Sequence, residues 1–185
     1  MKKFILLLVF LVTVSTTFSQ VTFKPGVRGG LNLATISNID DGSKIAFYGG
    51  LFGELRLGKL YALQPEITYS QQGSENIDLD YLAIRFTNKF YFFNEDMPLF
   101  ILISPGFDVN LDGDTQSYSS ATGAGVTFET DLSISGGVGY DFPFGLFAEV
   151  RYKQGIIDAL NTSNPDGRLN SVIQVGVGYK FDFSK

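Results

Sequence analysis

The sequence predicts an all-β protein, an eight-stranded antiparallel up-and-down transmembrane β-barrel. Eight segments alternate apolar and polar residues with the period of two that is typical of a β-strand. The connections between them are alternately short, and long and polar, as in barrels whose tight turns all lie on one side of a membrane. Aromatic residues make up 15% of the chain, yet beyond its N-terminal region no apolar run is long enough for a membrane-spanning helix.

The N-terminal region has the three parts of an export signal. Lys2 and Lys3 precede an apolar run at residues 4–12, and a small-x-small cleavage site follows at residues 17–19. The apolar run is too short to cross a membrane as a helix, which argues against a transmembrane anchor. The predicted division is a signal peptide at residues 1–19 and one outer-membrane β-barrel domain at residues 20–185.

Composition excludes several classes of function. Cleavage of the signal would remove two lysines and change the formal net charge from −5 to −7, which argues against nucleic-acid binding. The chain has no Cys for disulfides and no His for His-based nucleophilic catalysis. The Asp-Gly pairs near residues 41 and 112 are typical of turns. We therefore expect no enzyme activity, no cofactor and no metal site.

Four strands are expected in the N-terminal half, at residues 25–35, 44–57, 61–71 and 81–93. In each, the aliphatic and aromatic residues recur at alternate positions and so gather on one apolar face. If that face meets lipid, the residues at the intervening positions of each strand point into the lumen, the interior of the barrel. The charged residues among them are Arg28 in the first strand, Glu54 and Arg56 in the second, Glu66 in the third, and Arg85 and Lys89 in the fourth.

Four more strands are expected at residues 99–111, 126–142, 145–154 and 174–183. The last alternates strictly, with Val175, Val177 and Tyr179 on one face and small or polar residues on the other. The charged lumen residues of this half are Asp108 in the fifth strand, Asp131 in the sixth, Glu149, Arg151 and Lys153 in the seventh, and Lys180 in the eighth.

The connections set the predicted topology. Long polar loops are expected at residues 37–43, 72–80, 112–125 and 155–170, with short turns between the other strands. An even strand number then places both termini on the periplasmic side. Aromatic residues near the two barrel ends predict interfacial girdles, with Tyr91 near the short turns and Tyr81 near the long loops.

Two interpretations of the lumen charges remain open. An eight-stranded barrel has an interior just filled by side chains, so these groups are expected to pair into a structural plug. The alternative is an ion path through a narrow pore. A soluble, lipocalin-like barrel is a separate alternative, in which the same alternation places the apolar residues inside and the charges in water.

Five segments carry a resemblance to a known family. They are Gly26-Val-Arg-Gly-Gly-Leu-Asn32, Tyr81-Leu-Ala-Ile-Arg-Phe86, Gly137-Val-Gly-Tyr-Asp-Phe142, Arg151-Tyr-Lys-Gln-Gly155 and Val175-Gly-Val-Gly-Tyr-Lys-Phe181. On these the chain resembles the outer-membrane β-barrel family of Gram-negative bacteria that is often labelled "porin family" or PorT-like, with barrels of the OmpA/OmpX type. The ending also resembles a barrel-assembly signal, carried by Gln174, Gly176, Tyr179 and Phe181.

The resemblance implies a protein of the Gram-negative outer membrane, reached after signal-peptide export. The leading expectation is a non-enzymatic protein with a filled polar lumen and an envelope structural or surface-interaction role. The alternatives are a narrow porin-like channel for ions or small solutes and a PorT-like accessory component of protein secretion. Expected partners are outer-membrane lipid, the barrel-assembly machinery and an extracellular protein or glycan bound through the loops, with no nucleic acid.

Overall fold

The computed structural model describes residues 21–36, 42–74, 77–92, 98–111, 131–156 and 170–183. They form eight β-strands: β1 (Thr22–Ile36), β2 (Lys44–Arg56), β3 (Tyr61–Ser74), β4 (Ile77–Phe92), β5 (Leu99–Asn110), β6 (Asp131–Asp141), β7 (Leu146–Gly155) and β8 (Asn170–Lys180). Within these ranges no helix is long and apolar enough to cross a membrane. The predicted signal peptide and much of the predicted loops lie outside the described residues.

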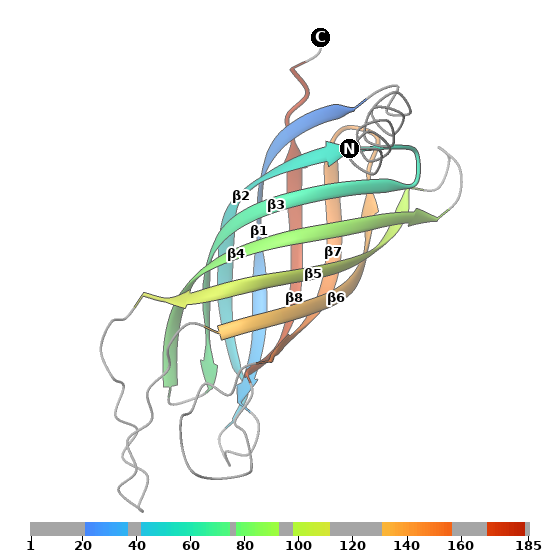
Figure 1. The fold of residues 1–185 in the computed structure, drawn as a ribbon. Coiled ribbons are helices and arrows are strands. Elements are labelled where there is room, and N and C mark those ends of the chain that lie inside the picture. Colours follow the sequence, from blue (N-terminus) through green and yellow to red (C-terminus); the bar gives the residue numbers. More distant parts are fainter. Residues whose placement is uncertain are drawn as a thin grey trace, which may run out of the picture.

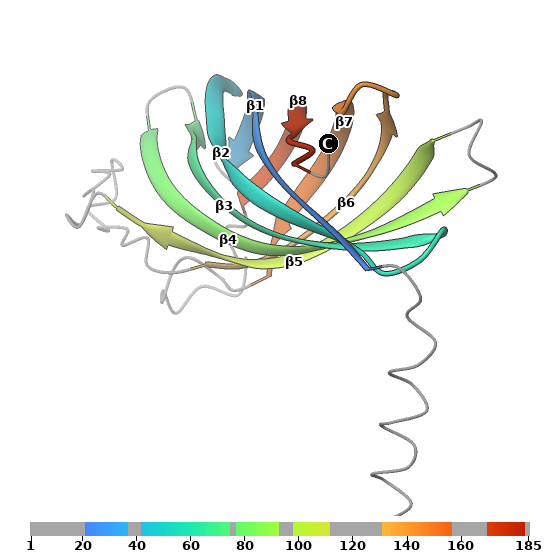
Figure 2. The same ribbon diagram turned by 90° about the horizontal axis from the view of Figure 1, so that it is seen from above.

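The strands close into one barrel. Each pairs antiparallel with its neighbour in the chain, and β1 also pairs antiparallel with β8 (Figure 1). Figure 2 shows the strands curving around a common interior. Closure leaves no edge strand with unpaired backbone groups, as a lipid environment requires. The predicted eight-stranded antiparallel up-and-down barrel is confirmed.

The two ends of the barrel differ. One, here called the short-turn end, holds the turns 57–60 and 142–145, the end of β4, the start of β5, the start of β1 and the end of β8. At the other, the loop end, β1, β3, β5 and β7 end and β2, β4, β6 and β8 begin (Figure 1). The barrel therefore begins and finishes on the same side, because with an even number of strands the start of β1 and the end of β8 both lie at the short-turn end.

One predicted loop is wrong. Residues 72–80 were expected to connect two strands, but β3 and β4 continue through them, with Gln72 opposite Leu79 and Ser74 opposite Ile77. Leu79 and Tyr81 face the interior here, while Asp80 lies on the outer face and accepts a 2.6 Å hydrogen bond from Tyr69 Oη. Because Leu79 and Tyr81 turn inward and Asp80 outward, this part of the hairpin lacks the pattern of a lipid-facing wall.

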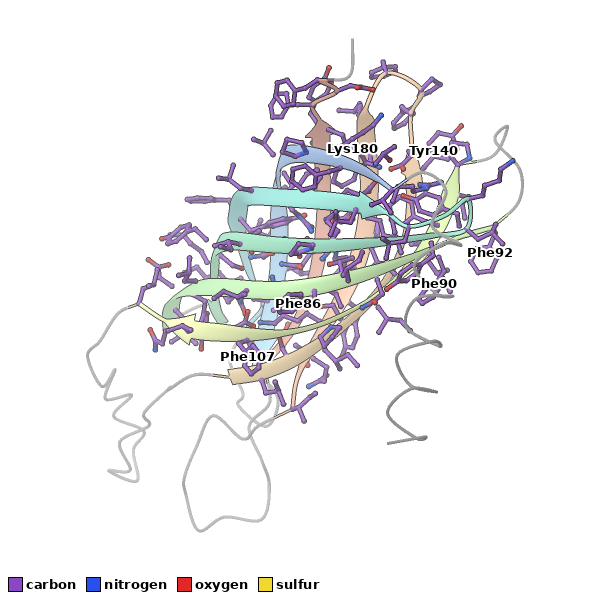
Figure 3. All side chains as sticks on the ribbon, turned by 45° about the horizontal axis from the view of Figure 1, so that its top comes forward. Phe86, Phe90, Phe92, Phe107, Tyr140 and Lys180 are labelled. Atoms are coloured by element: carbon purple, nitrogen blue, oxygen red, sulfur yellow. The ribbon has the colours of Figure 1, made fainter. Side chains whose placement is uncertain are left out.

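The outer wall is apolar along the rest of the strands. Phe86 on β4 and Phe107 on β5 are about half exposed, and both are labelled in Figure 3. Leu31, Leu51, Ile67 and Val175 are exposed in the same way on β1, β2, β3 and β8. A band of this kind suits lipid and not water. The soluble, inside-out alternative is therefore wrong, since the charges lie inside and the aliphatic residues outside.

Candidate functional site

The lumen contains the charged residues that the alternation places on one face of each strand. Arg28, Glu66, Arg151, Lys153 and Asp108 are each 94% or more shielded from solvent, with exposed fractions from 0% to 6%. Charged side chains are rarely this buried unless they are paired. Their contacts divide into a central cluster and one cluster toward each end of the barrel.

The central cluster joins opposite walls. Arg28 on β1 donates to Glu66 on β3 at 2.5 Å and also pairs with Glu149 on β7. Arg151 on β7 donates from Nη1 to Glu66 Oε1 at 2.8 Å and from Nη2 to Glu149 Oε2 at 3.2 Å. Strands β3 and β7 are four positions apart in the ring of eight, so the Glu66–Arg151 pair spans the bore.

A second cluster lies toward the loop end. Arg85 on β4 donates to Asp108 on β5 at 2.7 Å, and Lys153 on β7 pairs with the other oxygen of the same carboxylate. Lys153 Nζ also donates to Gln72 Oε1 at 2.6 Å, and Asn170 Nδ2 donates to the same oxygen at 2.7 Å. This cluster again connects strands that are not neighbours, here β3, β5 and β7.

The third cluster lies toward the short-turn end. Glu54 on β2 accepts from Lys89 on β4 at 3.0 Å and from Lys180 on β8 at 2.8 Å. Lys180 also pairs with Asp141 at 2.6 Å, and Asp141 accepts from Tyr91 Oη at 2.9 Å. Asp141 was missing from the predicted set, although it shares the inward phase of β6 with Ser133 and Ser135.

Aromatic rings surround this third cluster. Lys89 Nζ lies 4.6 Å from the ring centre of Phe100 and 4.4 Å from that of Phe147, which gives the ammonium two cation–π contacts. Phe147 packs edge-on against Phe52, and Tyr91 packs against Phe100. The prediction that Tyr91 and Tyr81 belong to the outer girdles is wrong, because they are 5% and 2% exposed inside the barrel.

Arg56 stands apart from the three clusters. Its Nε and Nη2 donate to the carbonyl oxygens of Gly58 and Lys59, each at 3.1 Å. Its guanidinium lies 3.6 Å above the centre of the Tyr91 ring. The residue therefore sits at the short-turn mouth of the lumen. Asp131 begins β6 opposite Asp108, but its side chain lies outside the described part of the structure.

The four residues of the predicted assembly signal occupy different places. Gln174 faces inward and donates to Asn32 at 2.8 Å. Gly176 also faces inward, where a Cβ atom would lie 1.9 Å from Tyr48 Oη. Tyr179 is on the outer wall, and Phe181 follows the end of β8 with its amide bonded to Pro25. Gln174 and Gly176 therefore have packing contacts within the barrel itself.

The described residues contain no group of three or more Asp, Glu, His or Cys that could hold a metal ion. The buried acids instead accept hydrogen bonds from arginine and lysine side chains. Since each central carboxylate is bonded on more than one side, the geometry is that of a cross-braced interior.

Comparison with known proteins identifies the family. Residues 4–181 match the family described as outer membrane protein beta-barrel domain. Neisserial surface protein A is similar in fold, with a TM-score of 0.54 and 16% identity over 88% of this chain and 100% of that one. The attachment invasion locus protein Ail of Yersinia pestis has a TM-score of 0.49 and 13% identity, with 86% and 97% of the two chains covered. For OprG of Pseudomonas aeruginosa the TM-score is 0.49 and the identity 14%, over 88% and 97%.

No curated protein sequence matches significantly. At 16% identity, the likeness to Neisserial surface protein A shows the fold alone. The family match spans nearly the whole chain, and it agrees with the closed barrel and its apolar outer wall. The chain belongs to the outer membrane protein beta-barrel domain family and is an outer-membrane β-barrel protein of Gram-negative type.

Proposed function

We propose that this protein is a non-enzymatic component of the outer membrane whose lumen is a closed structural plug, and that it serves the envelope or binds partners at the cell surface. The observation that carries the proposal is the Glu66–Arg151 pair, which joins opposite walls of the bore. Arg28 and Glu149 complete this cross-brace from β1 and β7.

The energetics of the buried pairs support a plug. Removing one partner of a buried ion pair costs about 3–5 kcal/mol, because the other charge is left uncompensated. A permeating ion would have to displace such pairs at the centre and again at the Asp108 and Glu54 clusters. The narrow interior of an eight-stranded barrel offers little room beside them.

A narrow channel is the second candidate, and one observation favours it. Polar groups follow one another from Asp108 through Glu66 to Glu54, and the buried hydroxyl of Ser135 makes no hydrogen bond to a described residue. Water could occupy such positions and connect the clusters. In this case the pairs would be a gate and not a permanent brace.

Single-channel recording in planar bilayers separates the two candidates. The plug predicts no discrete openings for the wild-type protein, and the same silence for an Asn88→Gln control on the outer wall. Discrete openings that vanish when Arg85 and Glu66 are both neutralised would favour the channel and contradict the plug.

Four further expectations accompany this proposal. Residues 1–19 would direct export and then be cleaved. Gln174, Gly176, Tyr179 and Phe181 would engage the barrel-assembly machinery. The predicted loops, among them 112–125 and 155–170, would contact an extracellular protein or glycan. Crosslinking from Tyr118 in cells that yields no specific adduct would count against this. A PorT-like secretion role predicts that deletion of the gene depletes secreted proteins from the medium.

A further inference from the structure

A layer of apolar side chains crosses the lumen near the short-turn end. Its members, here called the aromatic layer, form one buried hydrophobic cluster and come from β2, β3, β4, β5 and β7: Phe52, Ala62, Tyr91, Phe100, Leu102 and Phe147. The rings of Phe52 and Phe147 meet edge to face, with their centres 5.5 Å apart. Those of Tyr91 and Phe100 lie 5.4 Å apart. The layer therefore consists of rings in direct contact.

Glycines on the remaining three strands make room for the phenylalanine rings. Each of these rings has a glycine directly opposite it on the neighbouring strand: Gly26 on β1 opposite Phe52, Gly139 on β6 opposite Phe100, and Gly178 on β8 opposite Phe147. In all three pairs a Cβ atom on the glycine would overlap the ring. The rings thus extend over β1, β6 and β8, so that all eight strands take part and side chains fill the bore at this level.

The aromatic layer and its facing glycines divide the lumen charges into two groups. On the side of the short-turn end, Glu54, Asp141 and Lys180 each follow a member of this level by two residues. On the side of the loop end, Arg28 and Glu149 do the same. The third cluster therefore faces the short-turn mouth, while the central cluster lies behind the rings.

Lys89 on β4 brings a charge into the aromatic layer itself. Its ammonium lies 4.6 Å from the ring centre of Phe100 and 4.4 Å from that of Phe147, and it donates to Glu54 at 3.0 Å. The side chain is 0% exposed, so its charge is balanced by the ring faces and one carboxylate in place of water. These contacts also hold the two rings in position.

We propose that the aromatic layer is the permeability barrier of the barrel, and that it stops ions between the polar lumen and the short-turn mouth whether or not the central ion pairs are formed. This inference rests on the closed lumen proposed above and names the residues that close it. An ion at this level would exchange its hydration shell for ring atoms, and hydrophobic constrictions close pores in this way. The Glu66–Arg151 pair then stabilises the fold, while the rings make the seal.

The test compares full-length barrels in planar bilayers in KCl, at equal amounts of inserted protein. Phe100→Ala combined with Phe147→Ala removes two rings and opens the Lys89 ammonium to water, so the conductance should rise about tenfold or more over the wild-type background, which requires a barrier lowered by only about 1.4 kcal/mol. The matched control is Phe86→Ala combined with Phe107→Ala, which removes two rings from the outer wall and should leave the barrel closed (Figure 3).

Two further variants separate the layer from the ion pairs. Glu66→Gln combined with Arg151→Gln breaks the central pair but keeps the rings, so this barrel should stay closed. Adding Gly178→Phe to Phe147→Ala moves a ring to the facing position on β8 and should lower the conductance again from that of Phe147→Ala alone. A mere loss of stability would not be repaired by a ring placed on the opposite strand.

The outcomes distinguish this inference from the proposed closed lumen. A Phe100→Ala, Phe147→Ala barrel that is folded, as shown by its faster unboiled gel band, and yet as silent as the wild type overturns the aromatic layer alone. A leak through the Glu66→Gln, Arg151→Gln barrel as large as that of the ring variant also overturns it. Openings of the wild-type protein would overturn the closed lumen and the layer together.

Discussion

The carboxylate of Glu66 accepts hydrogen bonds from three side chains inside the barrel. Arg28, Arg151 and Gln64 donate to it at 2.5, 2.8 and 2.9 Å. Burying an ionised carboxylate costs several kcal/mol, and only close pairing with good geometry offsets that cost. At the scale of single residues, the stability of the lumen therefore depends on keeping each charge matched.

Glu66→Gln tests this dependence. The change leaves Arg28 and Arg151 with less negative charge nearby, so the free energy of unfolding should fall by about 3–5 kcal/mol. Lys24→Gln removes one side of an ion pair whose side chains are 39% and 38% exposed, and it should cost no more than about 1 kcal/mol. Urea titration of the protein in lipid vesicles measures both. Equal losses for the two variants would show that the buried ion pairs of Glu66 contribute no more to stability than the exposed pair of Lys24.

Gly176→Ala separates packing from recognition in the predicted assembly signal. The new methyl group would collide with Tyr48 Oη, at 1.9 Å, so a loss of about 1–3 kcal/mol is expected in the purified barrel. Tyr48→Phe in the same chain should restore part of it. If Gly176→Ala blocks insertion in cells but leaves the purified barrel as stable as the wild type, the residue acts through the assembly machinery and not through Tyr48.

At the scale of elements, the β3–β4 hairpin depends on one backbone position. Gly73 has φ of +115°, a conformation that residues with a side chain rarely adopt. Gly73→Val should cost about 1–3 kcal/mol and speed hydrogen exchange of the hairpin amides. Gly58→Val is the matched control, because a Cβ there meets nothing within 4 Å. Unchanged exchange in Gly73→Val would contradict this account of the hairpin.

The strands could be predicted from the sequence because a membrane wall imposes a strict period of two. The prediction failed at 72–80, where the hairpin lacks that wall pattern: Leu79 turns inward and Asp80 outward. It also failed at Tyr91, whose residue type suggested a girdle although its phase matches that of Arg85 and Lys89 inside. Phase is the stronger signal, since the pleat sends neighbouring side chains to opposite faces.

The pairing of the lumen charges could not be predicted. Alternation places Glu66 and Arg151 on inward faces. Whether they meet depends on the tilt of β3 and β7 in the closed barrel, which the register of all eight strands sets together. Asp108 shows the same limit, because it pairs with Arg85 on the neighbouring strand and with Lys153 on a distant one. Such partners follow only from the closed geometry of the barrel.

At the scale of the whole molecule, the outer wall requires lipid. Ile67 on β3 is 54% exposed and Leu60 in the turn 57–60 is 62% exposed, so a soluble protein would tolerate a charge at both. In a bilayer, Ile67→Arg should cost about 2–4 kcal/mol, whereas Leu60→Arg near the interface should cost about 0–1 kcal/mol. Urea titration in vesicles checks the difference. Similar small losses at both positions would argue against a membrane-spanning wall.

The most direct test of a closed membrane barrel is the gel mobility of the extracted protein, with and without boiling. The account predicts extraction only with detergent and a compact, fast-migrating unboiled band that slows on heating, because the closed hydrogen-bonded wall resists the detergent until it is heated. Recovery in the aqueous fraction, with one mobility before and after boiling, would contradict it.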